Sequence, residues 1–199
     1  MCIRDRERPG YVQNSPARCF HCKDELYTAL AALARAEGIA WVADGTNADD
    51  LDDFRPGLAA ARQHGVRSPL LEAGLGKAEI RELSRQMGLP TWDKPASPCL
   101  ASRIPYGTPV TVEALERIER AEAFLRSLGL RVLRVRHHDA IARIETDAEG
   151  METLMAQRER VVEGLRSLGY LYVTLDLAGY RRGALNAGLR GQRAPSRGE

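Results

Sequence analysis

Residues 24–43, which read DELYTALAALARAEGIAWVA, carry the pattern that decides the fold class. Leu26, Leu30 and Leu33 recur at helical spacing, and Gly38 ends this predicted helix. Residues 39–43 follow as a short apolar run, which is typical of a strand buried in a parallel sheet. A helix that leads directly into such a strand predicts an α/β fold.

The same alternation continues along the next stretch of the chain. We expect a helix over about residues 56–64, a short strand over 68–71 and a helix over 77–87. This alternation of helices and strands predicts a parallel sheet with crossover helices. Ligands bind at the carboxyl ends of such strands, where the polar loop of residues 44–53 lies. Its Asn47, Asp49 and Asp50 could contact a ribose, an amine or a metal, although a solvated acidic turn explains the same residues.

The pattern changes after residues 89–108, a long proline-rich loop of the kind that is functional or a linker. Beyond it we expect a helix over 112–128 capped by Thr111, strands over 131–136 and 140–146, a helix over 151–168 and a strand over 170–176. This order predicts a small α+β domain. The expected divisions are a first domain at 9–108, a second at 109–187 and a disordered tail at 188–199.

Composition limits the class of protein. The 199 residues are 44% hydrophobic and 28% charged, which is typical of a globular chain, and a net charge of +2 is too small to indicate nucleic-acid binding. No apolar run has the length of a membrane span and no signal core precedes the fold, so we expect a cytoplasmic protein. Residues 1–8 have no pattern and are interpreted as a cloning or gene-calling scar.

The cysteines are the first candidates for chemistry, because a reducing compartment disfavours a disulfide framework. Cys19 and Cys22, placed just before the predicted helix, can hold one metal or cluster, or serve as structural thiols. Cys99 lies in a loop stiffened by prolines and could be held at a fixed point; the alternative is a buried apolar cysteine. Ser102 and Arg103, just beyond it, can bind an anion.

A pair of arginines is the second candidate. Arg134 and Arg136 lie two residues apart on a predicted strand, so their side chains point to one face. Two adjacent guanidinium groups repel each other unless an anion, such as a phosphate or a carboxylate, lies between them. A solvated edge strand is the alternative. His137 and His138 follow on the same strand, and we expect them at the surface with no role.

Several long motifs resemble one family in order and register. They are RCFHCK (18–23), DGTNADDLDDFRPGL (44–58), CLASRIPYG (99–107), LRVRHHDAIARIE (133–145) and LGYLYVTLDLAGYRRGALN (168–186). From about Cys19 to Asn186 the chain resembles the LarE-type sulfur transferases of the PP-loop ATP-pyrophosphatase superfamily. The resemblance implies an adenine-nucleotide α-hydrolase-like sheet domain, here without its first strand and loop, followed by a small α+β domain.

The resemblance also implies an activity. LarE-type proteins use ATP and Mg to adenylylate a carboxylate of a pyridinium nucleotide derived from nicotinic acid, and they replace it with a thiocarboxylate on the way to the nickel-pincer nucleotide cofactor. Some members give up the sulfur of their own cysteine, and others carry a 4Fe–4S cluster on three cysteines. The family's SGGxDS loop is absent from this sequence, so we expect these residues alone to bind ATP weakly and to be inactive.

Site roles follow from the same resemblance. The sacrificial cysteine of the family aligns with Pro98, so Cys19, Cys22 and Cys99 are expected to hold a 4Fe–4S cluster with one iron left open. The other expected site residues are Ser102, Arg103, Arg134 and Arg136 at the substrate phosphate, Asp50 and Arg55 in the nucleotide and substrate cleft, Arg181 and Arg182 along the site, and Glu122 as a metal or site carboxylate. A homo-oligomer is expected, with no membrane partner.

Four alternatives stay open at this point. Cys99 could be a one-shot sulfur donor, or a structural zinc could recruit His21 in place of the cluster. The chain could be a tRNA thiolase of the same superfamily, although its near-neutral charge argues against that. It could also be a non-catalytic fragment.

Overall fold

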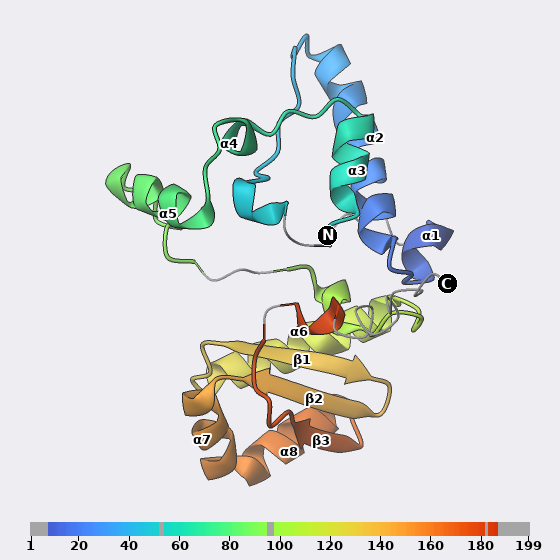
Figure 1. The fold of residues 1–199 in the computed structure, drawn as a ribbon. Helices are drawn as coiled ribbons and strands as arrows, with labels where there is room; N and C mark the ends of the chain where they lie inside the picture. The colour runs from blue at the N-terminus through green and yellow to red at the C-terminus, as the bar shows by residue number, and fades with distance from the viewer. Residues whose placement is uncertain (1–7, 52–53, 95–97, 182, 187–199) are drawn as a thin grey trace, which may run out of the picture. The chain divides into compact units, whose positions relative to one another are not determined.

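The computed structural model describes residues 8–51, 54–94, 98–181 and 183–186, and it divides the chain into two compact units, Met1–Pro98 and Cys99–Glu199. The elements of the first unit are α1 (Pro9–Val12), α2 (Arg18–Ala36), the 3-10 turn η2 (Ala48–Asp50), α3 (Gly57–Gln63), α4 (Pro69–Glu72) and α5 (Lys77–Gln86). Figure 1 labels the helices and strands of both units. The tail expected to be disordered lies outside the described residues.

A small helical core holds the first unit together. Tyr27 of α2 packs against Ala60 and Ala61 of α3, and their small side chains let the two helices approach closely. The three helices predicted for this half are confirmed. Helix α2, however, already begins at Arg18, so Cys19 and Cys22 lie within the start of the helix and not before it.

The parallel sheet predicted for the first unit is reduced to one bridge among the described residues. Ala43 pairs with Arg67 in parallel, through hydrogen bonds from Asp44 N to Arg67 O and from Arg67 N to Val42 O, both 2.9 Å long. The strand predicted over 68–71 is wrong. Helix α4 begins there instead, because Pro69 favours the first helical position and Glu72 accepts a hydrogen bond from Ser68 N at 3.1 Å.

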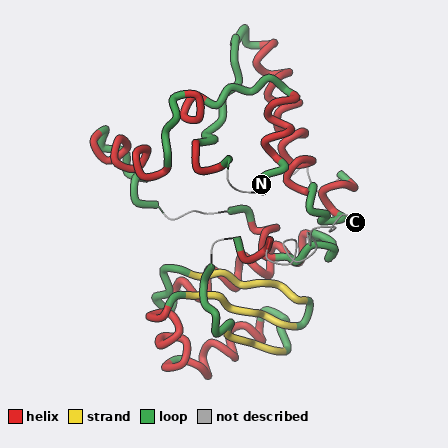
Figure 2. The backbone as a smooth tube through the Cα atoms, in the orientation of Figure 1, coloured by secondary structure: helices red, strands yellow, loops and turns green. Residues whose placement is uncertain are grey.

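The second unit is an α+β fold, as predicted. Its elements are η3 (Leu100–Arg103), α6 (Val112–Ser127), β1 (Leu133–His138), β2 (Ile141–Thr146), α7 (Ala148–Ala156), α8 (Arg158–Ser167), β3 (Tyr172–Leu175) and η4 (Ala184–Asn186). The sheet order is β1-β2-β3, with β1 antiparallel and β3 parallel to β2. Figure 2 shows all three strands in this half of the chain.

Local signals explain most boundaries of the second unit. Thr111 caps α6 by accepting a hydrogen bond from Ala114 N at 3.1 Å, as predicted. The single helix predicted over 151–168 is two helices, α7 and α8, that meet at Gln157. Helix α7 begins earlier than predicted, because Asp147 caps it by accepting from Gly150 N at 3.0 Å.

The core of the second unit lies between one sheet face and the helices. Alternate strand residues, among them Val135 and Ile144, pack with Leu125 of α6 and Leu165 of α8, and all four are essentially inaccessible to solvent. The neighbouring strand residues therefore face the other way. Segment η3 packs against α6 and β1, so the chain from Cys99 onward belongs to this unit.

Candidate functional site

Glu122 is a buried carboxylate that accepts four hydrogen bonds from three residues. Arg103 binds it through both Nε (2.8 Å) and one terminal nitrogen (3.1 Å), Arg126 donates at 2.9 Å, and Val135 N donates at 3.2 Å. The side chains of Arg103 and Glu122 are 5% and 1% exposed. A bidentate pair with this burial fixes η3 to α6, because breaking it would leave a charge uncompensated away from water.

A second buried pair lies on the sheet. Arg136 of β1 holds Glu145 of β2 through two hydrogen bonds of 2.9 and 2.8 Å, and its remaining terminal nitrogen donates to Ser102 O at 2.7 Å. Arg143 adds a third donor to Glu145 at 3.1 Å. The backbone of η3 is therefore anchored to β1 as well as to α6.

Arg134 lies next to this pair and contacts a different group. It donates to the Tyr180 hydroxyl at 2.9 Å, and its guanidinium lies 4.6 Å from the centre of the Tyr180 ring. Burial lowers the pKa of Arg134, and the positive charges of Arg136 and Arg103 act in the same direction while Tyr180 opposes them. The three cationic groups thus meet at one end of the sheet.

The surroundings of Arg134 and Arg136 decide one of the two sequence interpretations, and a substrate anion at these residues stays a prediction. Both side chains are buried, so the solvated edge strand is excluded. A protein carboxylate, Glu145, neutralises Arg136.

The surface position expected for His137 is wrong, because its side chain is buried and its Nδ1 lies 3.2 Å from the Tyr170 hydroxyl. Arg181 is exposed, and Arg182 lies outside the described residues.

The predicted cysteine ligands lie in both units. Cys99 is exposed at the start of η3, and its carbonyl oxygen accepts a hydrogen bond from Arg103 at 3.3 Å. Cys19 and Cys22 are half-buried cysteines near the start of α2. Within the ranges that the structure describes, no group of three or more His, Cys, Asp and Glu residues could hold a metal ion. The three-cysteine cluster, whose expected ligands come from both units, stays a prediction.

Asp50 and Arg55, predicted in the nucleotide cleft, come together in the first unit. Asp50 is buried, and its Oδ1 accepts from Arg55 at 3.0 Å and from Lys77 Nζ at 2.8 Å. Asp49 accepts from Lys77 N at 2.7 Å, and Ala48 N donates to Leu75 O at 2.9 Å. The loop after Ala43 is therefore attached to the start of α5. The Asp50 carboxylate lies between the cationic groups of Arg55 and Lys77.

Asp44 forms a second polar centre in this unit. It accepts from the Tyr27 hydroxyl at 2.9 Å, from Ser68 Oγ at 2.8 Å and from Thr46 N at 3.1 Å. Burial raises the pKa of Asp44, but the hydrogen bonds from Ser68, Thr46 and Tyr27 together lower it below its ordinary value. Burial and Asp44 raise the pKa of Tyr27. The pair is held as carboxylate and phenol at neutral pH.

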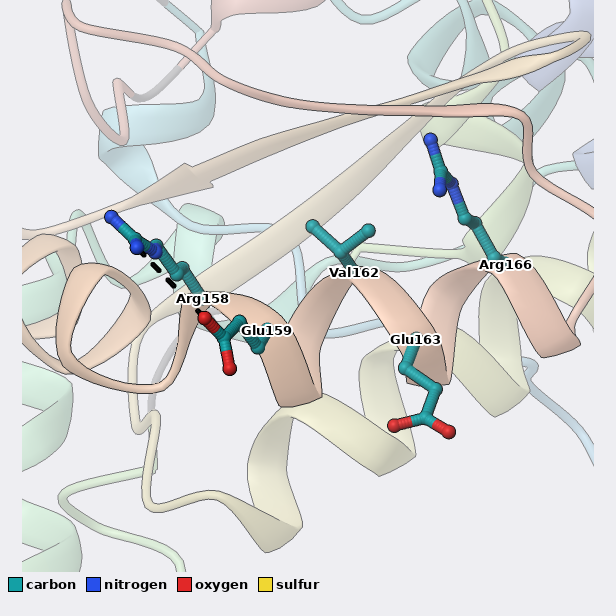
Figure 3. A pocket seen from close by; sticks show the side chains of 5 residues that line it. All are labelled: Arg158, Glu159, Val162, Glu163 and Arg166. Carbon is teal, nitrogen blue, oxygen red and sulfur yellow. Dashed lines mark ion pairs between the residues drawn. The ribbon is translucent and has the colours of Figure 1, made fainter.

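An open hollow along α8 has different chemistry. Five residues line it, Arg158, Glu159, Val162, Glu163 and Arg166, and the charged groups of Arg158 and Glu159 face each other (Figure 3). Arg158 and Glu159 lie 3.8 Å apart. This mixed, exposed set of charges contains none of the predicted site residues, so it is no candidate for the active centre.

Comparisons with known proteins agree with the motifs. The chain is 48% identical over 180 residues to the uncharacterised protein slr1717 of Synechocystis, a match that covers 89% of this chain and 67% of that protein. It is 42% identical over 173 residues to the pyridinium-3,5-bisthiocarboxylic acid mononucleotide synthase of Lactiplantibacillus plantarum, covering 87% and 63%. Together with the motifs, these relatives support a LarE-type chain.

A third, more distant relative is the uncharacterised protein MJ0830 of Methanocaldococcus jannaschii, 29% identical over 170 residues, with 85% of this chain and 66% of that protein covered. No family model matches the chain. This LarE-type chain spans about two thirds of the length of the curated relatives that it matches. No helix in the described ranges is long and apolar enough to cross a membrane.

Sequence reasoning about this LarE-type chain missed four site residues. Glu145 and Arg143 complete the Arg136 cluster, and Lys77 and Asp44 complete the two centres of the first unit. A local signal existed for Glu145 and Arg143, because residues of alternating charge on a hairpin meet across the strands. Lys77 has no such signal, since its contact with Asp50 depends on how two distant loops pack.

Proposed function

We propose that this LarE-type protein carries out ATP-dependent sulfur transfer, converting carboxylates of a pyridinium nucleotide to thiocarboxylates for the nickel-pincer nucleotide cofactor. The observation that carries the proposal is its 42% identity to a pyridinium-3,5-bisthiocarboxylic acid mononucleotide synthase. The Arg103–Glu122 and Arg136–Glu145 ion pairs form a buried framework around η3. This framework supports the proposal, because a reactive cysteine must be held in a fixed position.

The framework positions Cys99. Arg103 donates to Cys99 O and, at 3.0 Å, to Ser102 Oγ, while Arg136 holds Ser102 O. Both arginines are themselves oriented by buried carboxylates, Glu122 and Glu145. The backbone beside the thiol is therefore held by two charge-assisted contacts, whereas the thiol itself remains exposed to a reaction partner.

The proposal includes a 4Fe–4S cluster on Cys19, Cys22 and Cys99. Thiolates are the preferred ligands of such clusters, and Cys19, Cys22 and Cys99 are the cysteines that follow residue 8. When bound, a cluster with three protein ligands offers an open iron position for sulfide. Cys19 and Cys22 would supply two ligands from one helical turn, and Cys99 the third from η3.

The remaining predicted residues take binding roles in the proposal. Arg134 and Arg136 would attract the phosphate of the pyridinium nucleotide, and Ser102 would add a hydroxyl beside it. Asp50 and Arg55 would contact the nucleotide in the first unit, with Mg supplied together with ATP. Arg103 and Glu122 act through η3, so we assign them to positioning.

A second candidate is that Cys99 donates its own sulfur, which its exposure favours. The thiol of Cys99 would attack the adenylylated carboxyl carbon and displace AMP. Cleavage of the Cβ–S bond, with loss of the Cα proton, would then leave the thiocarboxylate on the substrate and dehydroalanine in the chain. This route gives one turnover per protein and needs neither Cys19 nor Cys22.

Anaerobic reconstitution with iron and sulfide separates the two routes. The cluster route predicts a brown protein with comparable iron and sulfide, and Cys19→Ser, Cys22→Ser or Cys99→Ser should each abolish the colour. Under the donor route, mass spectrometry should find dehydroalanine at position 99 after turnover. A colourless protein with an intact Cys99 after turnover would contradict both.

A further inference from the structure

Two nitrogen atoms on one face of the sheet lack hydrogen-bond partners. Among the described residues, His138 Nε2, Arg143 Nε and Asn47 Oδ1 are the buried side-chain polar atoms without a partner, and the first two belong to adjacent strands. A buried polar atom left unpaired costs about 1–3 kcal/mol, so it needs an explanation. A ligand that completes the hydrogen bonds is one.

The strand register places these two side chains together. Arg143 of β2 lies opposite Arg136 of β1, and His138 lies two residues farther along β1 on the same face. His138 is therefore the diagonal neighbour of Arg143 across the hairpin. This face is the one turned away from the core formed by Val135 and Ala142.

Guanidinium groups surround the two unpartnered nitrogens. Arg134, Arg136 and Arg143 lie on this face with two carboxylates, Glu145 and Asp176, and the charge of Asp139 also acts on His138. Arg143 contacts Glu145 at 3.1 Å and Asp176 at 3.6 Å through its terminal nitrogens, so Nε is the donor that remains.

His138 can supply a matching donor. Burial lowers its pKa, and the charges of Arg143 and Arg136 lower it further, while Asp139 and Glu145 oppose them. The imidazole is neutral near pH 7, and in one tautomer it carries its hydrogen on Nε2. Two unpartnered donors, one of them on a guanidinium group, fit an oxygen atom that bears negative charge.

We propose that His138 and Arg143 form an oxyanion-binding subsite on this sheet face, taking a carboxylate or phosphoryl oxygen of a small molecule. If the proposed function holds, on which this assignment of the ligand rests, the oxyanion belongs to the pyridinium nucleotide. The subsite adds donors beside Arg136, whose own hydrogen bonds go to Glu145 and Ser102.

Binding of three probes to the 199-residue chain tests the proposal. Inorganic phosphate carries only the phosphoryl oxygens, nicotinate only the carboxylate, and nicotinic acid mononucleotide carries both. By calorimetry, His138→Phe and Arg143→Gln should each weaken binding of the recognised probe about tenfold, the scale of one charge-assisted hydrogen bond. His138→Gln, which keeps a donor, should lose less. Arg158→Gln, an exposed arginine on α8, is the control and should bind normally.

A spectroscopic measurement distinguishes contact from a structural role. The probe should shift the imidazole nitrogen signals of His138 and leave those of His137, which faces the core, unchanged. Unchanged affinity in His138→Phe and Arg143→Gln, or failure of all three probes to bind, would overturn the subsite. Binding of phosphate that depends on His138, with no gain for the mononucleotide, would support the subsite and contradict the pyridinium-nucleotide function.

Discussion

At the scale of single residues, Glu122 shows how burial changes the contribution of a charged side chain to stability. Its carboxylate is 1% exposed and pairs with a buried arginine, Arg103, and an exposed one, Arg126. Replacing a carboxylate by an amide leaves Arg103 buried without a counter-charge. The same carboxylate therefore forms one buried and one exposed ion pair, whose contributions to stability can be compared.

We expect Glu122→Gln to lower the free energy of unfolding by roughly 3–5 kcal/mol, the scale for one lost partner of a buried ion pair. Arg126→Gln removes only an exposed partner and should cost less than about 1 kcal/mol. Urea unfolding of the wild type and both variants measures the difference. Equal costs for the two substitutions would mean that the Arg103–Glu122 pair adds nothing beyond a surface contact.

The lowered pKa of buried His137 predicts that the stability of the protein depends on pH. Burial lowers its pKa below the ordinary 6.5, and the nearby Arg117 charge acts in the same direction. The unfolded chain therefore binds a proton at a higher pH than the folded chain does. The stability that the neutral imidazole provides is complete above about pH 6.5 and is lost as the pH falls toward the lower folded value.

Urea unfolding between pH 7.5 and 5 should accordingly show falling stability, and His137→Gln should flatten that fall. Gln keeps a polar group near the Tyr170 hydroxyl, which limits the cost of the change itself. Arg158→Gln serves as the control and should keep the wild-type slope. An identical slope in His137→Gln and the wild type would show that His137 does not titrate differently in the two states.

At the scale of elements, the contact between α6 and α8 depends on a glycine. A Cβ added at Gly164 would lie 2.2 Å from Phe124 Cζ, far inside the normal contact distance. Gly164→Ala should therefore destabilise the second unit by about 1–3 kcal/mol despite the better helix propensity of alanine.

Two further variants make this prediction specific. Glu163→Ala changes the exposed side of the same helix and should have little effect on the melting temperature. Adding Phe124→Leu to Gly164→Ala should recover part of the loss, because the ring that clashes is removed. A Gly164→Ala protein as stable as the wild type would mean that the Phe124 ring moves aside at no cost.

At the scale of the whole molecule, the two units differ in how much core they contain. Among the described residues, the second unit buries twelve in one cluster, whereas the cluster of the first contains Tyr27, Ala60 and Ala61. Tyr11 is also buried in the first unit, but Ile39 and Trp41 are more than half exposed. Hydrophobic burial is the main source of stability. The first unit should therefore open at a lower free energy than the second.

Hydrogen exchange followed by mass spectrometry tests this expectation. Amides of α3 and α5 should exchange well before those of β1, β2 and α6 under native conditions, and unfolding should deviate from two-state behaviour. The exchange rates of amides in α2, the helix that contributes Tyr27 to this core, provide a comparison within the first unit. Uniform protection across both units would show that they unfold together.

The sequence by itself determined most of the helices, the α+β order of the second half and the resemblance to a family. Helical periodicity, the Thr111 cap and strand alternation act between near neighbours, so they can be read along the chain. The family emerged because long motifs occur in register, which needs no knowledge of contacts. The wrong strand at 68–71 shows the limit of local reading, because short apolar runs suit a strand and a helix equally well.

Only the tertiary structure decided which polar side chains form the site. An isolated glutamate on a helix is normally exposed, yet Glu122 is buried because η3 brings Arg103 to it from nineteen positions away. Likewise, His137 faces the core while His138, its neighbour, faces the Arg136–Glu145 pair. Burial and pairing of charges depend on contacts between segments far apart in the chain, and desolvation acts only once those contacts exist.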